Sequence, residues 1–184
     1  MKAQVLPAEE IDAGDGISLT PLRAEDADDC FLACQDETVN RWIPLPSPYT
    51  RAIARSWCEG GAEAYRLSGS GVQFAIRLYG SFVGCMSLKN PNWREGIVEV
   101  SYWLAENERG KGIAGRAVAA LSNYAFSVGF DRVELRVAQG NSASARVAQK
   151  AGFREEGLLR SAGVLRSGRT DMRLFSLLMT DVFK

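Results

Sequence analysis

The stretch that decides the fold is Glu106-Asn107-Glu108-Arg109-Gly110-Lys111-Gly112-Ile113-Ala114-Gly115-Arg116. It lies between a predicted strand at 97–105 and the strongest predicted helix of the chain, at 113–128. In that helix the apolar residues recur at helical spacing, and Gly129 is suited to end it. The stretch is therefore a glycine-rich turn that leads from a strand into a helix.

The residues of this turn predict an anion-binding site. Gly110 and Gly112 let a ligand come close to the backbone, where the first N–H groups of the helix have no partner within it. Arg109, Lys111 and Arg116 stand at the positive end of the helix dipole, where cations are unfavourable unless an anion offsets them. A phosphate or pyrophosphate fits this pattern; the alternative is a plain turn with solvated charges.

Two familiar phosphate motifs fit less well. Residues 110–115 read G-x-G-x-x-G, but the dinucleotide fingerprint also needs an acid at the end of the next strand, and Glu134 lies in mid-strand. There is one β-α-β unit, because the earlier strands pair as hairpins. A P-loop is excluded, since no G-x-x-x-x-G-K-[ST] occurs. The Rossmann and P-loop classes are therefore disfavoured.

Outward from the turn, the chain predicts one α/β domain at 17–184, after a loose lead-in at 1–16. Alternation of apolar and polar residues predicts about seven strands in a mixed central sheet, with helices on both faces. The strands are expected at 17–22, 72–78, 82–88, 97–105, 132–137, 153–163 and 169–181. The helices are expected at 24–37, at 50–68 with Gly60-Gly61 weakening its middle, at 113–128 and at 141–151. A proline-containing loop is expected at 41–49.

Composition excludes several classes of protein. The 22 basic and 22 acidic residues give a net charge of zero, which argues against a nucleic-acid binder that works by bulk charge. The absence of histidine removes the commonest general base, the histidine-dependent triads and the usual zinc sites. No stretch approaches the ~20 apolar residues of a membrane span, so we expect a cytoplasmic protein without a membrane partner.

The four cysteines predict neither a metal site nor a disulfide framework. Cys30, Cys34 and Cys58 fall in predicted helices and Cys85 in a predicted strand, and their spacing matches no metal-ligand motif. We expect small buried thiols in a reducing compartment.

Several blocks together resemble the GNAT N-acetyltransferase superfamily. Residues 109–114 resemble its [QR]-x-x-G-x-[GA] acyl-CoA signature, and Glu99-Val100-Ser101-Tyr102-Trp103-Leu104 precedes them at the distance the family shows. The segment 141–153, which begins Asn141-Ser142-Ala143-Ser144, looks like its second block. The opening at 19–27 and the tail from Glu156 are similar to the ribosomal-protein (RimJ/RimL-like) branch. The resemblance covers residues 17–181 in the order of the family.

This resemblance implies an acetyl-CoA-dependent N-acetyltransferase without a metal. In the family, the strands on either side of the turn and its helix splay apart, and the pantetheine arm of CoA lies in the gap. The acceptor amine enters from the other side. The cofactor-binding residues carried over are Tyr102, Trp103, Leu104, Arg109, Gly110, Lys111, Gly112, Ile113, Ala114, Asn141 and Ser144. Asn141 also reads as an ordinary helix N-cap.

The acceptor implied is a primary amine, either a protein N-terminal α-amine, such as that of a ribosomal protein, or a small-molecule amine. The loop at 41–49 lies in the region that covers the acceptor side in this family, and its Trp42 and Tyr49 either line a pocket or pack on the core. The sequence is compatible with a homodimer and does not decide the oligomeric state. The alternative function is a CoA-binding sensor or regulatory module that does not catalyse.

Without histidine, the catalytic base is expected to be Glu99, which stands where several family members carry a glutamate base. Its alternative role is a structural ion pair with an arginine such as Arg136. The tyrosine that often protonates the departing thiolate is replaced by Ala148, which leaves Ser144, Ser101 and Tyr102 as weaker candidates. An acetyl-cysteine route through Cys85 is disfavoured, because Cys85 lies in mid-strand, so we expect direct transfer in a ternary complex.

Overall fold

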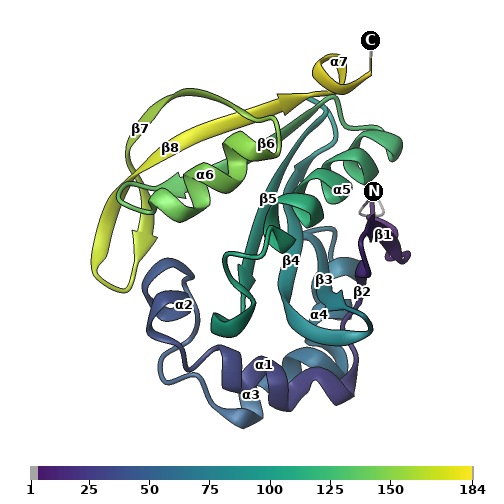
Figure 1. Cartoon of the computed structure of the whole chain (residues 1–184), viewed down its shortest axis with the longest axis vertical. Coiled ribbons are helices and arrows are strands. Elements are labelled where there is room, and N and C mark those ends of the chain that lie inside the picture. Colours follow the sequence, from purple (N-terminus) through teal and green to yellow (C-terminus); the bar gives the residue numbers. More distant parts are fainter. Residues whose placement is uncertain (1–3, 184) are drawn as a thin grey trace.

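The computed structural model describes residues 4–183, which form one open eight-stranded sheet with helices on both faces (Figure 1). The strands are β1 Ile11–Gly14, β2 Ile17–Pro21, β3 Gly71–Leu78, β4 Ser81–Asn92, β5 Ile97–Leu104, β6 Arg132–Ala138, β7 Arg154–Leu165 and β8 Gly168–Leu178. The helices are α1 Ala27–Ala33, α2 Glu37–Trp42, α3 Arg51–Ser56, α4 Ala62–Leu67, α5 Ile113–Ser127, α6 Ser142–Lys150 and α7 Met179–Val182. The predicted mixed sheet and its two helical layers are confirmed.

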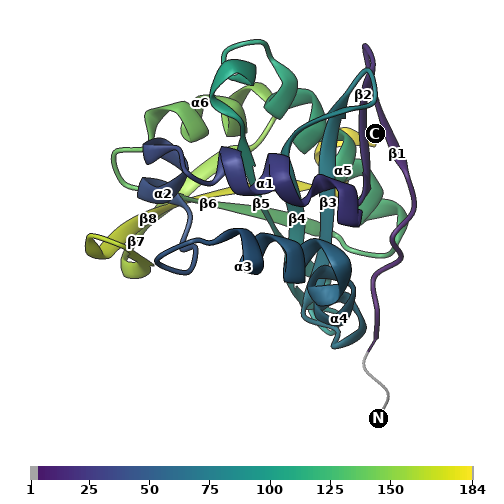
Figure 2. The same cartoon turned by 90° about the horizontal axis from the view of Figure 1, so that it is seen from below.

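The sheet order is β1-β2-β3-β4-β5-β6-β8-β7, and β5–β6 is its parallel pair. Helix α5 supplies the crossover between β5 and β6 and packs on one face with α6, while α1, α3 and α4 cover the other face (Figure 2). The main apolar core lies between α5 and the sheet and includes Phe74, Leu121 and Phe130. A second cluster lies under the other helices and includes Cys30, Cys34 and Cys58.

Strands β5 and β6 form backbone pairs at only one end. Their pairing covers only Ile97–Glu99 with Arg132–Glu134. β5 stays paired with β4 as far as Leu104, and β6 stays paired with β8 as far as Ala138. The two strands therefore separate beyond Glu99 and leave an opening in the middle of the sheet.

The expectation of a loose lead-in at 1–16 is wrong in part. Residues 11–14 form β1, which pairs with β2 so that Ile11 faces Leu19, and the side chain of Leu6 is buried in the main core. The polar composition of the segment gave no indication of this edge strand. Its Ile11 and Ala13 nevertheless pack against the main core. Residues 1–3 of this prediction lie outside the described residues.

The early helices are more broken than predicted. The predicted helix at 24–37 is a 3₁₀ turn followed by α1, and a separate helix α2 begins after Asp36. The predicted loop at 41–49 therefore starts within the end of α2. Thr50 caps α3 as predicted, accepting from the N–H of Ile53 at 3.3 Å. The Gly60-Gly61 pair falls in a π-helical turn, Trp57–Gly61, between α3 and α4.

Within residues 4–183, no helix is long and apolar enough to cross a membrane. In the same residues, no group of three histidine, cysteine or acidic side chains is placed to hold a metal ion.

Candidate active site

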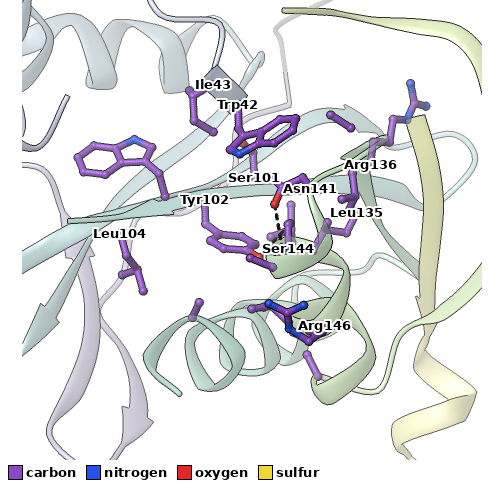
Figure 3. Close-up of a pocket in the computed structure, with 18 of the residues that line it drawn as sticks. Trp42, Ile43, Ser101, Tyr102, Leu104, Leu135, Arg136, Asn141, Ser144 and Arg146 are labelled. Atoms are coloured by element: carbon purple, nitrogen blue, oxygen red, sulfur yellow. Dashed lines mark hydrogen bonds between the residues drawn. The ribbon is translucent and has the colours of Figure 1, made fainter. Parts of the chain in front are cut away.

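A cavity of about 890 Å³ fills the opening between β5 and β6. Its lining comes from both strands, from the end of β4, from the glycine turn and the first half of α5, from the length of α6, from α2 and from the β7–β8 hairpin. The predicted site residues that line it are Glu99, Tyr102, Trp103, Leu104, Arg109, Gly110, Gly112, Ile113, Ala114, Asn141 and Ser144. Lys111 is the predicted site residue that does not line it. Figure 3 shows Tyr102 and Ser144 together near the middle of the cavity, with Trp42 across from them.

The glycine turn offers an open stretch of backbone to the cavity. Gly110 and Gly112 have φ values of +78° and +81°, which side-chain-bearing residues rarely adopt. A Cβ atom at either position would meet no atom of the protein within 4 Å, so the space beside the backbone is free. Gly112 is the N-cap of α5 and provides no side-chain cap. The first N–H groups of α5 are thus left for a ligand, and the turn fits a pyrophosphate group.

The three cations of the turn are less exposed to a ligand than the sequence indicated. Arg109 donates from Nη2 to the carboxylate of Asp36. Its Nε and Nη2 also donate to the carbonyl oxygen of Leu104, at 3.1 and 3.0 Å. Lys111 pairs with Glu108 at 3.0 Å, and Arg116 pairs with Asp15 at 3.0 Å. These charges therefore do not by themselves require a bound anion. The prediction of a phosphate site therefore rests on the open backbone at Gly110 and Gly112.

The contact between Arg109 and Asp36 braces the turn against α2. Asp36 is also the N-cap of α2, accepting from the N–H of Val39 at 2.9 Å. Burial raises the pKa of Asp36, but the hydrogen bond from Arg109 and those from the backbone outweigh it, so the pKa lies below its usual value. The carboxylate form is the one that stabilises the fold.

We expect Asp36→Asn to lower the free energy of unfolding at pH 7 by about 1.5 kcal/mol, the low end for a hydrogen bond to a charged group. Asparagine keeps the helix cap, so the charge is what is lost. Because the pKa is lowered by folding, the unfolded chain binds more protons, and this stabilisation disappears as pH falls below the usual aspartate range. Urea unfolding of both proteins at several pH values measures the difference. A gap that stays constant down to pH 3 would contradict this role.

The start of α6 and strand β5 bring two hydroxyl groups together in the cavity. Asn141 caps α6 by accepting from the N–H of Ser144 at 3.1 Å (dashed in Figure 3). The hydroxyl groups of Ser144 and Tyr102 are 3.0 Å apart. Burial raises the pKa of Tyr102 to about 12, although the hydrogen bond to Ser144 opposes it. Tyr102 therefore keeps its proton near neutral pH and is available as a proton donor.

Glu99 lies on the opposite face of the sheet from these hydroxyls. Val98, Val100 and Leu104 belong to the main core under α5, so the alternation of β5 turns Glu99 and Trp103 to the other face. There Trp103 packs edge-on against Phe82, with ring centroids 6.0 Å apart. A cofactor on the α5 side and an acceptor on the Glu99 side would thus meet through the opening.

The side chain of Glu99 is 9% exposed and is held by three groups. Its Oε1 is 3.0 Å from Nζ of Lys89, its cross-strand partner on β4. Its Oε2 accepts from Nδ2 of Asn90 at 3.2 Å and is 3.9 Å from Nε of Arg136. The structure thus adds Lys89 as a closer cation than the arginine that the sequence suggested. No local pattern of the sequence indicates Lys89, because its position depends on strand register.

One wall of the cavity near Glu99 is apolar and was only partly predicted. Trp42, Ile43 and Pro44 come from α2 and the loop after it, and face Ala162, Gly163, Val164, Leu165 and Met172 of the β7–β8 hairpin. Arg166 at the tip of the hairpin donates to Oδ1 of Asn40 in α2 at 2.9 Å, which joins the two sides. Of the two aromatic residues predicted in this region, Trp42 lines the cavity. Tyr49 instead packs in the second core cluster, with its hydroxyl 3.6 Å from Sγ of Cys30.

The four cysteines are free and buried, as the sequence indicated. Cys85 lies in β4 and does not line the cavity. Burial raises the pKa of its thiol, so a reactive thiolate is disfavoured there.

The splayed β5–β6 pair, the open glycine turn and the helix that follows it define a GNAT-type acetyltransferase, and the acetyltransferase (GNAT) domain family matches residues 17–154. The chain belongs to this family, which confirms the resemblance seen in the sequence and the class of enzyme it implies. Among related proteins, the chain is 27% identical over 165 residues to the uncharacterized N-acetyltransferase p20 of Bacillus licheniformis, covering 88% of this chain and 92% of that protein.

Two further relatives belong to the ribosomal-protein branch by name. "Putative ribosomal N-acetyltransferase YdaF" of Bacillus subtilis is 34% identical over 110 residues, which are 59% of this chain and 60% of that relative's length. The structure of Mycobacterium smegmatis RimJ in complex with CoA-disulfide superposes with a TM-score of 0.86 at 27% identity, covering 96% of this chain and 90% of that chain.

Proposed function

We propose that the chain transfers the acetyl group of acetyl-CoA directly to a primary amine, with a protein N-terminal α-amine, such as that of a ribosomal protein, as the acceptor. The observation that carries the proposal is the opening between β5 and β6, which has the phosphate-binding turn on one face of the sheet and a buried carboxylate on the other. The RimJ relative with bound CoA-disulfide and the name of YdaF support both the cofactor and the acceptor.

Binding of the cofactor uses main-chain groups. The N–H groups at the start of α5 would hold the pyrophosphate. Within the described residues, no strand pairs with the β6-facing edge of β5 beyond Glu99, so the free backbone groups of Ser101–Leu104 can bond the pantetheine amides as a neighbouring strand would. Lys111 contributes charge near the turn rather than a direct contact with the cavity.

Catalysis requires a base on one face and a proton donor on the other. Glu99 accepts the proton of the acceptor ammonium, directly or through a water molecule, and the neutral amine then attacks the thioester carbonyl. As the C–S bond breaks, Tyr102 or Ser144 supplies a proton to the departing thiolate. Tyr102 keeps its proton at neutral pH, with a pKa of about 12, and Ser144 lies 3.0 Å from it.

We expect turnover when the protein is given acetyl-CoA and a panel of N-terminal peptides and small amines, followed by release of free thiol. Peptide N-termini should be preferred to simple alkyl amines, because the apolar wall of Trp42, Ile43 and Val164 can bind a peptide's first side chains. Mass spectrometry of the peptide checks that the new acetyl group is on the α-amine. CoA binding without thiol release for any amine would instead support a CoA-binding sensor.

A further inference from the structure

The charges that line the cavity are unequal. Among residues 4–183, the cationic side chains of its lining are Lys89, Arg109, Arg116, Arg136, Arg146 and Lys150, and the carboxylate of its lining is Glu99. Those on α5, α6 and the glycine turn lie on the cofactor side, as Figure 3 shows for Arg146. Lys89 and Arg136 remain, and they stand on either side of Glu99.

Arg136 has the same orientation as Glu99. Leu135 and Val137, its neighbours on β6, are buried in the core under α5, so alternation turns Arg136 to the acceptor face. Its side chain is 40% exposed, and in Figure 3 it lies on the far side of the cavity from Leu104. The guanidinium is thus at the surface that an acceptor must pass.

The partners of Arg136 hold it loosely. Its Nη2 is 3.4 Å from Glu134 and its Nε is 3.9 Å from Glu99. Glu134 is held more closely by Arg132, at 2.9 Å, and Lys89 holds Glu99 at 3.0 Å. Arg132 also binds Glu156, at 2.5 Å, so Glu134 is shared between two arginines. Both contacts of Arg136 are long, at 3.4 and 3.9 Å, which leaves N–H donors for another acceptor.

An ammonium ion bound at Glu99 would stand between two cations. Glu134 lies outside the cavity lining, so within the cavity Lys89, Arg136 and the ammonium would face the negative charge of Glu99 alone. The site is partly buried, and the repulsion among these cations is weakly screened there. A carboxylate carried by the acceptor, close to its amine, would offset the excess and bond Arg136 as a charge-assisted pair. A polycationic acceptor would increase the repulsion.

We propose that Arg136 selects acceptors that carry a carboxylate next to the reacting amine. This inference rests on the proposed function and adds the chemistry of the acceptor to it. Two sources provide that chemistry: a peptide whose second residue is acidic, and a free amino acid with its own carboxylate. Arg41, stacked over the ring of Trp42 at 4.7 Å, adds a further cation beside the apolar wall.

The test compares matched acceptors that differ in one charge. Peptides beginning Ser-Asp, Ser-Asn and Ser-Lys form one series, and a free amino acid with its amide forms the other. We expect kcat/KM for Ser-Asp to exceed that for Ser-Asn by about tenfold, the ratio for one charge-assisted hydrogen bond in a partly exposed site, with Ser-Lys lowest. A preference seen in the amino-acid series and absent from the peptides would identify the small molecule as the source.

Variants assign the effect to Arg136. Arg136→Gln should bring the Ser-Asp to Ser-Asn ratio close to one, Arg136→Glu should favour Ser-Lys, and Arg136→Lys should restore part of the ratio. Arg160→Gln is the matched control, because Arg160 is an exposed arginine of β7 outside the cavity lining. An unchanged affinity for CoA shows that each variant is folded.

Calorimetry of the same peptides with the CoA-loaded protein measures selectivity without catalysis. Selective binding without turnover would overturn the proposed function and keep this inference. Equal binding and equal turnover of Ser-Asp, Ser-Asn and Ser-Lys would overturn the inference and leave the proposed function intact.

Discussion

Replacement of Glu99 by glutamine is expected to lower kcat at neutral pH by about 10²–10⁴-fold, the usual contribution of a general base. Glutamine keeps the shape of the side chain and can still bond Asn90, but it cannot take the proton from the acceptor ammonium. The affinity for CoA should be unchanged, because Glu99 faces away from the glycine turn. The loss should shrink above about pH 8, where an α-amine is increasingly deprotonated without help.

Glu134→Gln is the matched control for this variant. Glu134 occupies the position on β6 opposite Glu99 in the β5–β6 register, and its carboxylate also contacts arginines. Unlike Glu99, it does not line the cavity. It should keep kcat within a few-fold of the wild type. A pH–rate profile of Glu99→Gln that overlays the wild type would show that Glu99 is not the base. Unfolding of the variant would point to the ion pair with Lys89 as its main role, which a double-mutant cycle of the two residues can measure.

Replacement of Gly112 by valine is expected to raise the Kd for CoA by about a hundredfold or more. The added side chain would occupy the free space beside the backbone, where the cofactor's phosphates would approach the N–H groups of α5. Losing two charge-assisted hydrogen bonds of about 1.5 kcal/mol each corresponds to that factor. Isothermal titration with CoA gives the measurement directly.

Strain is the competing explanation, because valine at a φ of +81° is unfavourable wherever it occurs. Gly129→Val controls for it: Gly129 follows the other end of α5, has a φ of +105°, and also has free space around its Cβ position. This control should lose stability and still bind CoA. Normal CoA affinity in a folded Gly112→Val protein would reject the phosphate-binding turn.

The glycine turn and its helix were predictable because their signal is local. The glycines with positive φ, the unpaired N–H groups and the apolar spacing of α5 all lie within one short stretch of sequence. The same holds for Thr50 and Asn141 as N-caps, since each cap acts on a residue three positions later. Interactions between residues this close in the sequence do not depend on how the strands pair, so the sequence alone predicts them.

The surroundings of Glu99 were not predictable, because they depend on register. β4 runs beyond its predicted end, and the register with β5 shifts between Lys89 and Asn92, at an Asn90 with a φ of +53°. Lys89 pairs with Glu99 in the regular register that runs from the Gly84–Leu104 pair, and the shift follows this pair. No property of either residue in the sequence indicates the pairing. The apolar wall has the same origin, since β7 bends at two register shifts before its end reaches α2.

The wall formed by α2 and the β7–β8 hairpin is attached differently from the rest of the site. Its two sides meet through the side chains of Arg166 and Asn40, and α2 is tied to the turn through Asp36 and Arg109, whereas Glu99 is fixed in the hydrogen-bonded ladder of the sheet. Residues of the six-residue α2 and of the hairpin end can therefore change without disturbing the groups that bind the cofactor or carry out transfer. Such a division allows related enzymes to acquire new acceptors through successive substitutions in α2 and the hairpin. The same two segments are the ones to redesign when a new acceptor specificity is wanted.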